Sequence, residues 1–316
     1  MIVTGREKSE ISLLIREKAR ENGFELCGFA KARPLIEYIP VLERWCREGM
    51  NADMYYLARD IEKRFDPSAH LPGVKSVIVT GISYYSEIMQ EQPEVPLLSR
   101  YAYGKDYHTV VAEKLDQLVE LVKQRSPGSV ARKFIDSGAI SEKMWAREAG
   151  LGWQGRHSII INRDIGSFFF IGLILTDIEL EYDEPYRKDH CGDCRLCVDL
   201  CPTGAVGDDR TIDARKCIAN LTIENRGPIP VDIIPKLGRR VYGCDRCQEV
   251  CPWNKNAKKS GVAEFVLDRE IALMTLEDWK SLPEDKFRQL FRESAIQRVK
   301  FYQFAGNVKA ALASDV

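Results

Sequence analysis

Apolar and polar positions along the first 183 residues repeat with two periods, one typical of helices and one typical of strands. Helical spacing is clear for Ile11, Leu14 and Ile15, and it is most regular in VVAEKLDQLVELV, which begins at Val110. This spacing predicts helices at residues 9–22, 35–48, 52–63 and 109–125. Apolar, β-branched runs predict strands at residues 24–30, 74–85 and 130–135. The run 74–85 is apolar almost throughout, so we expect it at the centre of a sheet.

A short helix ending near Ala149 is followed by GLGWQG at 150–155 and by the apolar run HSIIIN. NRDIGS then predicts a turn, so that HSIIIN and SFFFIGLILTD form a hairpin. GLGWQG spells the dinucleotide pattern GxGxxG, but that pattern follows a strand and opens a helix, whereas these glycines follow a helix and precede a strand. We expect a close backbone approach to a flat or bulky ligand instead. Together these elements predict one α/β (α+β) domain over residues 1–183.

Composition narrows the class of protein. With 45% hydrophobic and 29% charged residues in 316, the chain is typical of a globular protein. No apolar run follows a basic N-terminal region, and none approaches the roughly 18 residues of a membrane span, so a cytoplasmic location without membrane contact is expected. A net charge of -1 lacks the basic excess of a dedicated nucleic-acid binder, so any such partner must be bound locally.

Eight of the ten cysteines lie between Cys191 and Cys251. CGDCRLCVDLCP matches the ferredoxin pattern CxxCxxCxxxCP, and CDRCQEVCP repeats its last part. In two-cluster ferredoxins each unit donates its last cysteine to the other cluster, which predicts two 4Fe-4S clusters in a ferredoxin-like domain at 184–260. The predicted ligand sets are Cys191, Cys194, Cys197 and Cys251, and Cys201, Cys217, Cys244 and Cys247. Zinc would also use CxxC pairs, but it does not explain the CxxxCP tails; Cys27 and Cys46 are expected to be packed thiols.

Residues 261–316 are rich in helix formers and combine basic with aromatic side chains. The favoured interpretation is a solvated helical face with aromatics packed inward. The alternative is a surface for folded RNA, helped by the nearby Lys255, Lys258 and Lys259. The residues concerned are Arg288, Phe291, Arg292, Arg298, Lys300, Phe301 and Tyr302.

Asp136, at the end of the strand 130–135, is the main acidic candidate of the first domain. A carboxylate at a strand end can cap a helix or form a turn, and it can also act as a general acid. His108 and His157 are equally ambiguous, and four histidines in the chain leave no obvious histidine metal site. Electron transfer alone needs little more than the cysteine domain, so the first domain is expected to hold a second redox centre, a substrate, or both.

The combination of motifs resembles the epoxyqueuosine reductase family over roughly residues 5 to 260. The resemblance is carried by RYAYGKDYH at 100–108, IDSGAISEKMWAREAGLGWQGRHS at 135–158, the cysteine pattern, CIANLTIENRGPIP at 217–230 and VYGCDRCQEVCPWN at 241–254. It implies a cobalamin-dependent iron-sulfur enzyme that acts on tRNA carrying epoxyqueuosine. In this reaction the epoxide becomes an alkene with loss of water, in the last step of queuosine biosynthesis. The resemblance also implies an external electron donor, and we expect a monomer.

The resemblance implies roles for particular residues. Asp136 matches the family's catalytic aspartate and would protonate the oxygen that leaves the epoxide. Cobalamin would be bordered by Asp136, Ser158, Ile160, Ile171 and the segment Cys244, Asp245, Arg246 and Cys247, partly through backbone groups. The first domain would thus bind cobalamin and substrate.

Two features depart from the family pattern. Arg156 and His157 stand where members commonly have lysine and asparagine, and 261–316 resembles a shortened version of the family's helical repeats. Two other readings stay open. One is another corrinoid reductase such as a reductive dehalogenase, although no twin-arginine export signal is visible; the other is a ferredoxin-like electron carrier.

Overall fold

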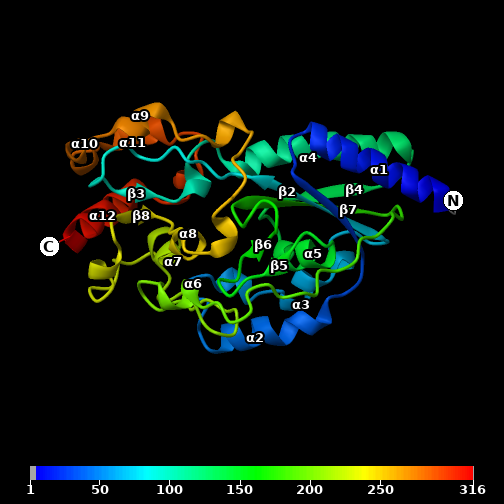
Figure 1. Ribbon diagram of the computed structural model, residues 1–316, viewed down its shortest axis with the longest axis horizontal. Helices are drawn as coiled ribbons and strands as arrows, with labels where there is room; N and C mark the ends of the chain where they lie inside the picture. The colour runs from blue at the N-terminus through cyan, green and yellow to red at the C-terminus, as the bar shows by residue number, and fades with distance from the viewer. Residues whose placement is uncertain (1–4, 316) are drawn as a thin grey trace.

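A four-stranded sheet of order β1-β2-β7-β4 forms the centre of the first half of the computed structural model, which describes residues 5–315 (Figure 1). Every neighbouring pair in this sheet is antiparallel. All eight residues of β2 are buried, which confirms the run 74–85 as an interior strand. The strands are β1 (Leu26–Lys31), β2 (Ser76–Ser83), β4 (Ala131–Phe134) and β7 (Phe169–Thr176).

Helices cover both faces of this sheet (Figure 1). On one face α1 (Gly5–Glu21) and α4 (Tyr107–Arg125) pack against Phe170 and Ile174 of β7. On the other face α5 (Glu142–Glu148) packs against Leu173 and Leu175, with α2 (Ile39–Arg47) and α3 (Ile61–Phe65) beyond it. The alternation along β7 follows from the two-residue period of a strand.

The helix predicted at 52–63 is wrong as one element. The structure has a short 3₁₀ turn at Tyr55–Leu57 and then α3, separated by Asp60 in the left-handed conformation with φ 53°. A residue with positive φ cannot continue a right-handed helix, so the pattern is interrupted there. The helix predicted at 35–48 begins as a 3₁₀ turn at Ile36–Tyr38 and continues as α2.

The hairpin predicted between HSIIIN and SFFFIGLILTD is also wrong as a ladder. β6 (Ile160–Ile161) pairs with β5 (Trp153–Gln154), while β7 pairs with β2 and β4; a bridge between Asn162 and Gly166 closes the expected turn. The side chain of Asn162 explains the difference, because its amide donates to the Leu151 carbonyl at 2.7 Å and its oxygen accepts from the backbone of the turn.

The glycines of GLGWQG approach the chain itself. Gly150 ends α5 with φ 74°, and a Cβ on Gly152 would lie 2.1 Å from the carbonyl oxygen of Ile161. Only glycine permits the β5–β6 pairing at that position. The close backbone approach predicted here therefore exists, but at Gly152 its partner is β6 and not a ligand.

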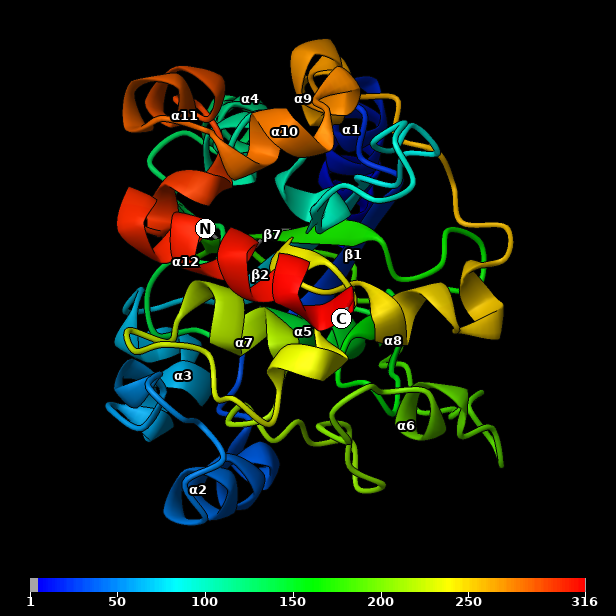
Figure 2. The ribbon, with the colours of Figure 1, turned by 90° about the vertical axis from the view of Figure 1, so that its left-hand side faces the viewer.

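The other half of the molecule contains a two-stranded parallel ribbon surrounded by short helices. In it β3 (Leu97–Leu98), from the first third of the chain, pairs with β8 (Arg240–Tyr242). Figure 2 shows α12 running between α7 and α8 on one side and α9, α10 and α11 on the other. Their shared core joins Leu98, Tyr242, Trp279 and Phe304, so it is built from three separate chain segments. The helices are α6 (Leu196–Asp199), α7 (Ile218–Ile223), α8 (Arg246–Glu249), α9 (Arg269–Leu273), α10 (Leu276–Lys280), α11 (Glu284–Leu290) and α12 (Phe301–Leu312).

In residues 261–316 the basic side chains lie on the surface and the aromatic side chains pack inward, as the favoured interpretation predicts. Phe291 is 1% exposed, and Arg288 and Arg298 form ion pairs on the surface with Glu284 and Glu224. Tyr302 is the exception at 69% exposed. Among the described residues, no helix combines the length and the apolar character needed to cross a membrane.

Candidate functional site

The structure gathers the first predicted ligand set in one place. Burial, and after it the proximity of Cys191, Cys197 and Cys194, raises the pKa of the Cys251 thiol to about 11. Burial raises the pKa of Cys197 as well, with Cys191 and Cys194 next to it. Cys251, which is distant in the sequence, therefore lies close enough to Cys191, Cys194 and Cys197 for the four thiols to influence one another's ionisation.

The second set gathers in the same way. Burial, followed by the proximity of Cys217, raises the pKa of Cys244 to about 12, and Cys217 is in turn influenced by Cys201. Burial raises the pKa of Cys247, with smaller contributions from Cys244 and Cys217 and from Cys197 of the first set. The two sets thus approach each other at Cys247 and Cys197.

These thiols are available as ligands for iron-sulfur clusters. All ten cysteines are free, and in residues 5–315 no group of three or more His, Cys, Asp or Glu side chains is placed to ligate one metal ion. Zinc requires its sulfurs at about 2.3 Å from one centre, whereas a four-iron cluster holds its cysteines further apart. Buried thiols with raised pKa lose their protons when a cationic centre binds. The individual ligand assignments stay predictions.

Asp136 lies where β4 leaves the sheet. Phe134 pairs with Leu173 of β7, so two residues later Asp136 is level with Ile171. Its φ of 45° is unusual for a residue with a side chain and marks the point where the chain departs from the extended strand conformation. The side chain is 71% exposed, and its Oδ2 accepts a hydrogen bond of 2.6 Å from the Tyr107 hydroxyl.

The start of α4 supplies the groups around this carboxylate. Asp106 caps the helix by accepting from the backbone N–H of His108 at 2.9 Å, and it also lies 2.7 Å from His108 Nδ1. The hydrogen bond to Asp106 raises the pKa of His108, whose Nε2 is 3.9 Å from Asp136 Oδ2. Tyr107 stacks on Phe170 at 4.3 Å, and burial followed by the charge of Asp136 raises its pKa.

Sequence reasoning missed Tyr107 as a partner of Asp136 and left His108 ambiguous. The available signal was the Asp-Tyr-His order at 106–108, in which Asp106 reads as a helix cap and places the next two side chains at a helix start. It does not reveal that β4 ends beside them.

Two further charged residues border Asp136 from α5. Burial, followed by the charge of Asp136, raises the pKa of Glu142 to about 8, and the buried Glu142 Oε1 has no hydrogen-bond partner within residues 5–315. Lys143 is exposed and donates from Nζ to the Ser158 carbonyl at 3.1 Å. Ser158, with φ 64°, is thereby brought to the same side as Asp136.

The other residues predicted to contact the cofactor differ from one another in their burial. Ile171 is half-buried on β7, whereas Ile160 is 1% exposed and its side chain packs in the core under α5. Asp245 is 7% exposed, and its carboxylate accepts from the Ser99 hydroxyl and from Arg100. Arg246 is half-buried at the start of α8.

Aromatic rings connect the Asp136 region to the second cysteine set. The Tyr101 ring lies 6.3 Å from Tyr107 and 6.0 Å from Tyr242, which precedes Cys244 by two residues. Tyr101 and Cys244 also pack against the same core. The set containing Cys244 is therefore linked to the acid through one short chain of packed side chains.

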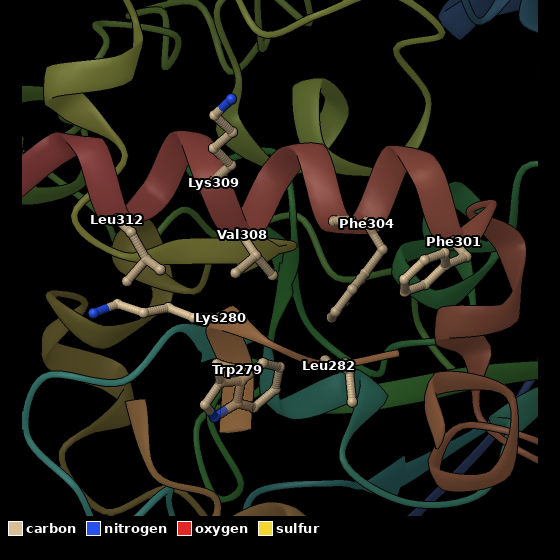
Figure 3. Close-up of a pocket in the computed structure, with 9 residues that line it drawn as sticks. Trp279, Lys280, Leu282, Phe301, Phe304, Val308, Lys309 and Leu312 are labelled. Atoms are coloured by element: carbon tan, nitrogen blue, oxygen red, sulfur yellow. The ribbon is translucent and has the colours of Figure 1, made fainter. Parts of the chain in front are cut away.

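Two cavities lie outside the group of residues around Asp136. A groove of about 320 Å³ between α10 and α12 is lined by Trp279, Phe304, Val308 and their neighbours, and it contains none of the predicted site residues (Figure 3). A second cavity of about 540 Å³ lies between residues 46–58 and α7. It is lined by Asn220, whose buried amide has no partner in the described part of the chain.

Paired cysteine sets beside an α+β domain with an acid at its edge define an iron-sulfur oxidoreductase. Residues 190–254 match the family described as "4Fe-4S double cluster binding domain", and residues 64–137, which include Asp136, match "Epoxyqueuosine reductase QueG, DUF1730". The epoxyqueuosine reductase of Cyclobacterium marinum is 38% identical over 93% of this chain and 94% of its own length. The chain belongs to the epoxyqueuosine reductase family.

Solved structures agree with this assignment. A crystal structure of epoxyqueuosine reductase with an epoxyqueuosine-modified tRNA-Tyr stem loop is 31% identical with a TM-score of 0.89, covering 96% of this chain and 81% of that one. The Bacillus subtilis enzyme, with its aspartate catalytic loop swung out of the active site, is 29% identical with a TM-score of 0.87, covering 96% and 82%. A catabolic reductive dehalogenase, 16% identical with a TM-score of 0.51, covers 98% and 36%, which shows a shared fold alone.

Proposed function

We propose that this enzyme reduces epoxyqueuosine to queuosine at the wobble position of tRNA, using cobalamin and two 4Fe-4S clusters. The observation that carries the proposal is the position of Asp136, which is hydrogen-bonded to Tyr107 and linked through Tyr101 and Tyr242 to the Cys244 set. The overall change consumes two electrons and two protons, converts the epoxide to an alkene and releases water.

Asp136 serves as the general acid for the leaving oxygen. The hydrogen bond from Tyr107 to Oδ2 fixes the carboxyl group, leaving Oδ1 to face the substrate. The hydrogen bond to Asp106 raises the pKa of His108, whose Nε2 lies 3.9 Å from Asp136 Oδ2 and whose side chain is half-exposed, so it can relay a proton from solvent to Asp136 after turnover. The catalytic aspartate loop of the Bacillus subtilis relative supports this role.

The residues around Asp136 fit a large ligand with an apolar face and polar edges. Half-buried Ile171 offers an apolar contact, and the unpaired Glu142 Oε1 offers an acceptor. Bound cobalamin would supply the redox metal that accepts electrons singly and passes them to the epoxide.

The two cysteine sets form the supply route for those electrons. Cys191, Cys194, Cys197 and Cys251 would hold one cluster, and Cys201, Cys217, Cys244 and Cys247 the other, with Cys197 and Cys247 within electrostatic range of each other. An external donor would reduce the first cluster, and the second would pass electrons to the site beside Tyr101. The enzyme would act as a monomer in the cytoplasm.

The tRNA contacts are local, as the net charge of -1 requires. Tyr56 is 38% exposed, and its pKa is raised by burial and then by Glu224, with Arg298 and Asp136 also in range. The aromatic ring of Tyr56 is suited to stack a base near the acid. The stem-loop complex of the related enzyme supports tRNA as the substrate.

The test is turnover by the anaerobically reconstituted protein with cobalamin, reductant and epoxyqueuosine-containing tRNA, followed by mass analysis of the nucleosides. Asp136→Asn should reduce the rate by roughly 10²–10⁴-fold while leaving the cofactor spectrum intact. Asp177→Asn is the matched control, because Asp177 also follows a strand but lies at the other end of β7.

Each outcome has a separate meaning. Absence of queuosine from wild-type protein with clusters and cobalamin loaded would refute the function, and a ferredoxin-like carrier would additionally show no corrin absorbance. Wild-type turnover by Asp136→Asn would refute only the acid role.

A further inference from the structure

An aromatic shell surrounds one end of the first cysteine set. The Trp153 ring lies 5.0 Å from Trp253, 4.9 Å from His190 and 5.7 Å from Tyr186. Trp153 belongs to a small hydrophobic cluster with Cys251, against which Cys191 also packs. The indole therefore lies beside two cysteines of the same predicted ligand set.

Trp153 carries a buried donor that the protein does not satisfy. The residue is 2% exposed, and its Nε1 has no hydrogen-bond partner within residues 5–315. Trp253, in the same shell, donates its Nε1–H to the His190 carbonyl at 3.3 Å. Buried polar groups are usually paired, so the Trp153 N–H is available to an acceptor on a group bound beside Cys251 and Cys191.

The GLGWQG segment holds Trp153 rigidly against the cysteine loop. Gly152 allows the close pairing with Ile161, which fixes the strand that carries Trp153. Arg156, at the end of the segment, donates to the carbonyl of Gly192 at 2.8 Å, between Cys191 and Cys194. The motif and the first turn of the cysteine loop are therefore joined from both sides of Trp153.

We propose that the Trp153 Nε1–H donates a hydrogen bond to a sulfur of the 4Fe-4S cluster held by Cys191, Cys194, Cys197 and Cys251, and thereby raises the reduction potential of that cluster. The inference rests on the cluster assignment of the proposed function. Reduction adds negative charge to the cluster sulfurs, so a fixed donor stabilises the reduced state more than the oxidised one. The indole N–H is a donor only and does not titrate near neutral pH, so the effect is independent of pH.

The test compares the reduction potentials of both clusters in reconstituted protein, measured by a redox titration followed by electron paramagnetic resonance. Trp153→Phe keeps an aromatic ring and removes the N–H. Its expected effect is about a tenfold lower reduced-to-oxidised ratio for one cluster at fixed potential, equal to about 59 mV for a one-electron couple, with the other cluster unchanged. No shift, or an equal shift of both clusters, would overturn the proposal.

Trp145→Phe is the matched control. Trp145 is fully buried and its Nε1 also lacks a partner among the described residues, but it belongs to α5 and packs in a hydrophobic cluster that contains none of the eight cysteines. We expect both potentials to remain at their wild-type values in this variant. A shift as large as that of Trp153→Phe would show that the potentials respond to any loss of a buried indole, and the proposal would fall.

A second measurement decides the matter if Trp153→Phe fails to load its clusters, as iron content would reveal. Protein labelled with ¹⁵N in the tryptophan indoles, with Trp253→Phe to leave Trp153 as the remaining indole of the shell, should show a ¹⁵N hyperfine coupling to the reduced cluster. Absence of this coupling would overturn the proposal. Neither measurement uses tRNA, so a negative result here is distinct from failure of the turnover test.

Discussion

Replacement of Asp245 by Asn tests whether this side chain locks the cysteine loop into the fold. Asp245 lies between Cys244 and Cys247, and it accepts a hydrogen bond of 2.9 Å from the Arg100 backbone and one of 3.3 Å from Arg100 Nη1. The Arg100 side chain is 10% exposed, and it also contacts Glu249 at 3.1 Å. In Asp245→Asn the negative charge is lost, and the new amide group would face the N–H donors of Arg100.

The magnitude follows from burial. Breaking a buried ion pair by removing one partner costs about 3–5 kcal/mol. Because Glu249 still neutralises part of the Arg100 charge, we expect the lower end, about 3 kcal/mol. The matched control is the exposed pair of Arg288 with Glu284, at 71% and 50% exposure and helical i,i+4 spacing. Glu284→Gln should cost no more than about 0.5 kcal/mol.

The assay is urea unfolding of cluster-loaded protein, followed by circular dichroism and by cluster absorbance. With an m-value of about 3 kcal/mol per molar, the upper end for small proteins, Asp245→Asn should lower the midpoint by about 1 M. Arg100→Met and the double variant complete a double-mutant cycle. The double variant should lose less free energy of unfolding than the sum of the losses in the two single variants. A midpoint for Asp245→Asn as close to wild type as that of Glu284→Gln, or strictly additive losses, would refute the reasoning.

Two further stability predictions follow from local geometry. Gly152→Ala should destabilise the protein by about 3 kcal/mol, because the new Cβ would lie 2.1 Å from the Ile161 carbonyl oxygen. Gly306→Ala, in open space on α12, should stabilise it by about 1 kcal/mol. Equal melting temperatures for the two variants would contradict this prediction. Burial lowers the pKa of His157 to about 4, below the unfolded value of about 6.5, so stability is full above pH 6.5 and should fall by about 3 kcal/mol as the pH drops towards 4. Urea midpoints across that range should show the loss, and an equally steep fall in His157→Gln would contradict its origin.

Sequence periodicity predicted the elements whose burial is decided locally. β2 is buried along its whole length and α4 has one continuous apolar face, so each could be read from its own residues. The cysteine sets could also be predicted from the sequence, because the spacing within a metal-binding loop is local information. Their grouping required Cys217, which only the count of thiolates suggested.

The remaining features depend on contacts between distant segments. β6 pairs with β5 because Gly152 admits the carbonyl of Ile161, and nothing in HSIIIN itself indicates that partner. The helix predicted at 52–63 breaks because Asp60 takes a left-handed conformation, which the helical spacing around it does not reveal. Tyr107 reaches Asp136 across 29 residues, since α4 begins where β4 ends. Such a contact is a property of the packed sheet and helix together.

The shared core of the second half restricts how such a protein can change by recombination. Leu98 and Tyr103, encoded in the first third of the gene, pack with Tyr242 and with the helices that follow Leu267. A crossover between relatives anywhere between those segments would combine halves whose interior side chains were selected separately. Viable exchanges must therefore preserve all three segments of the core together, and the acid-bearing and cluster-bearing parts would be inherited as a unit.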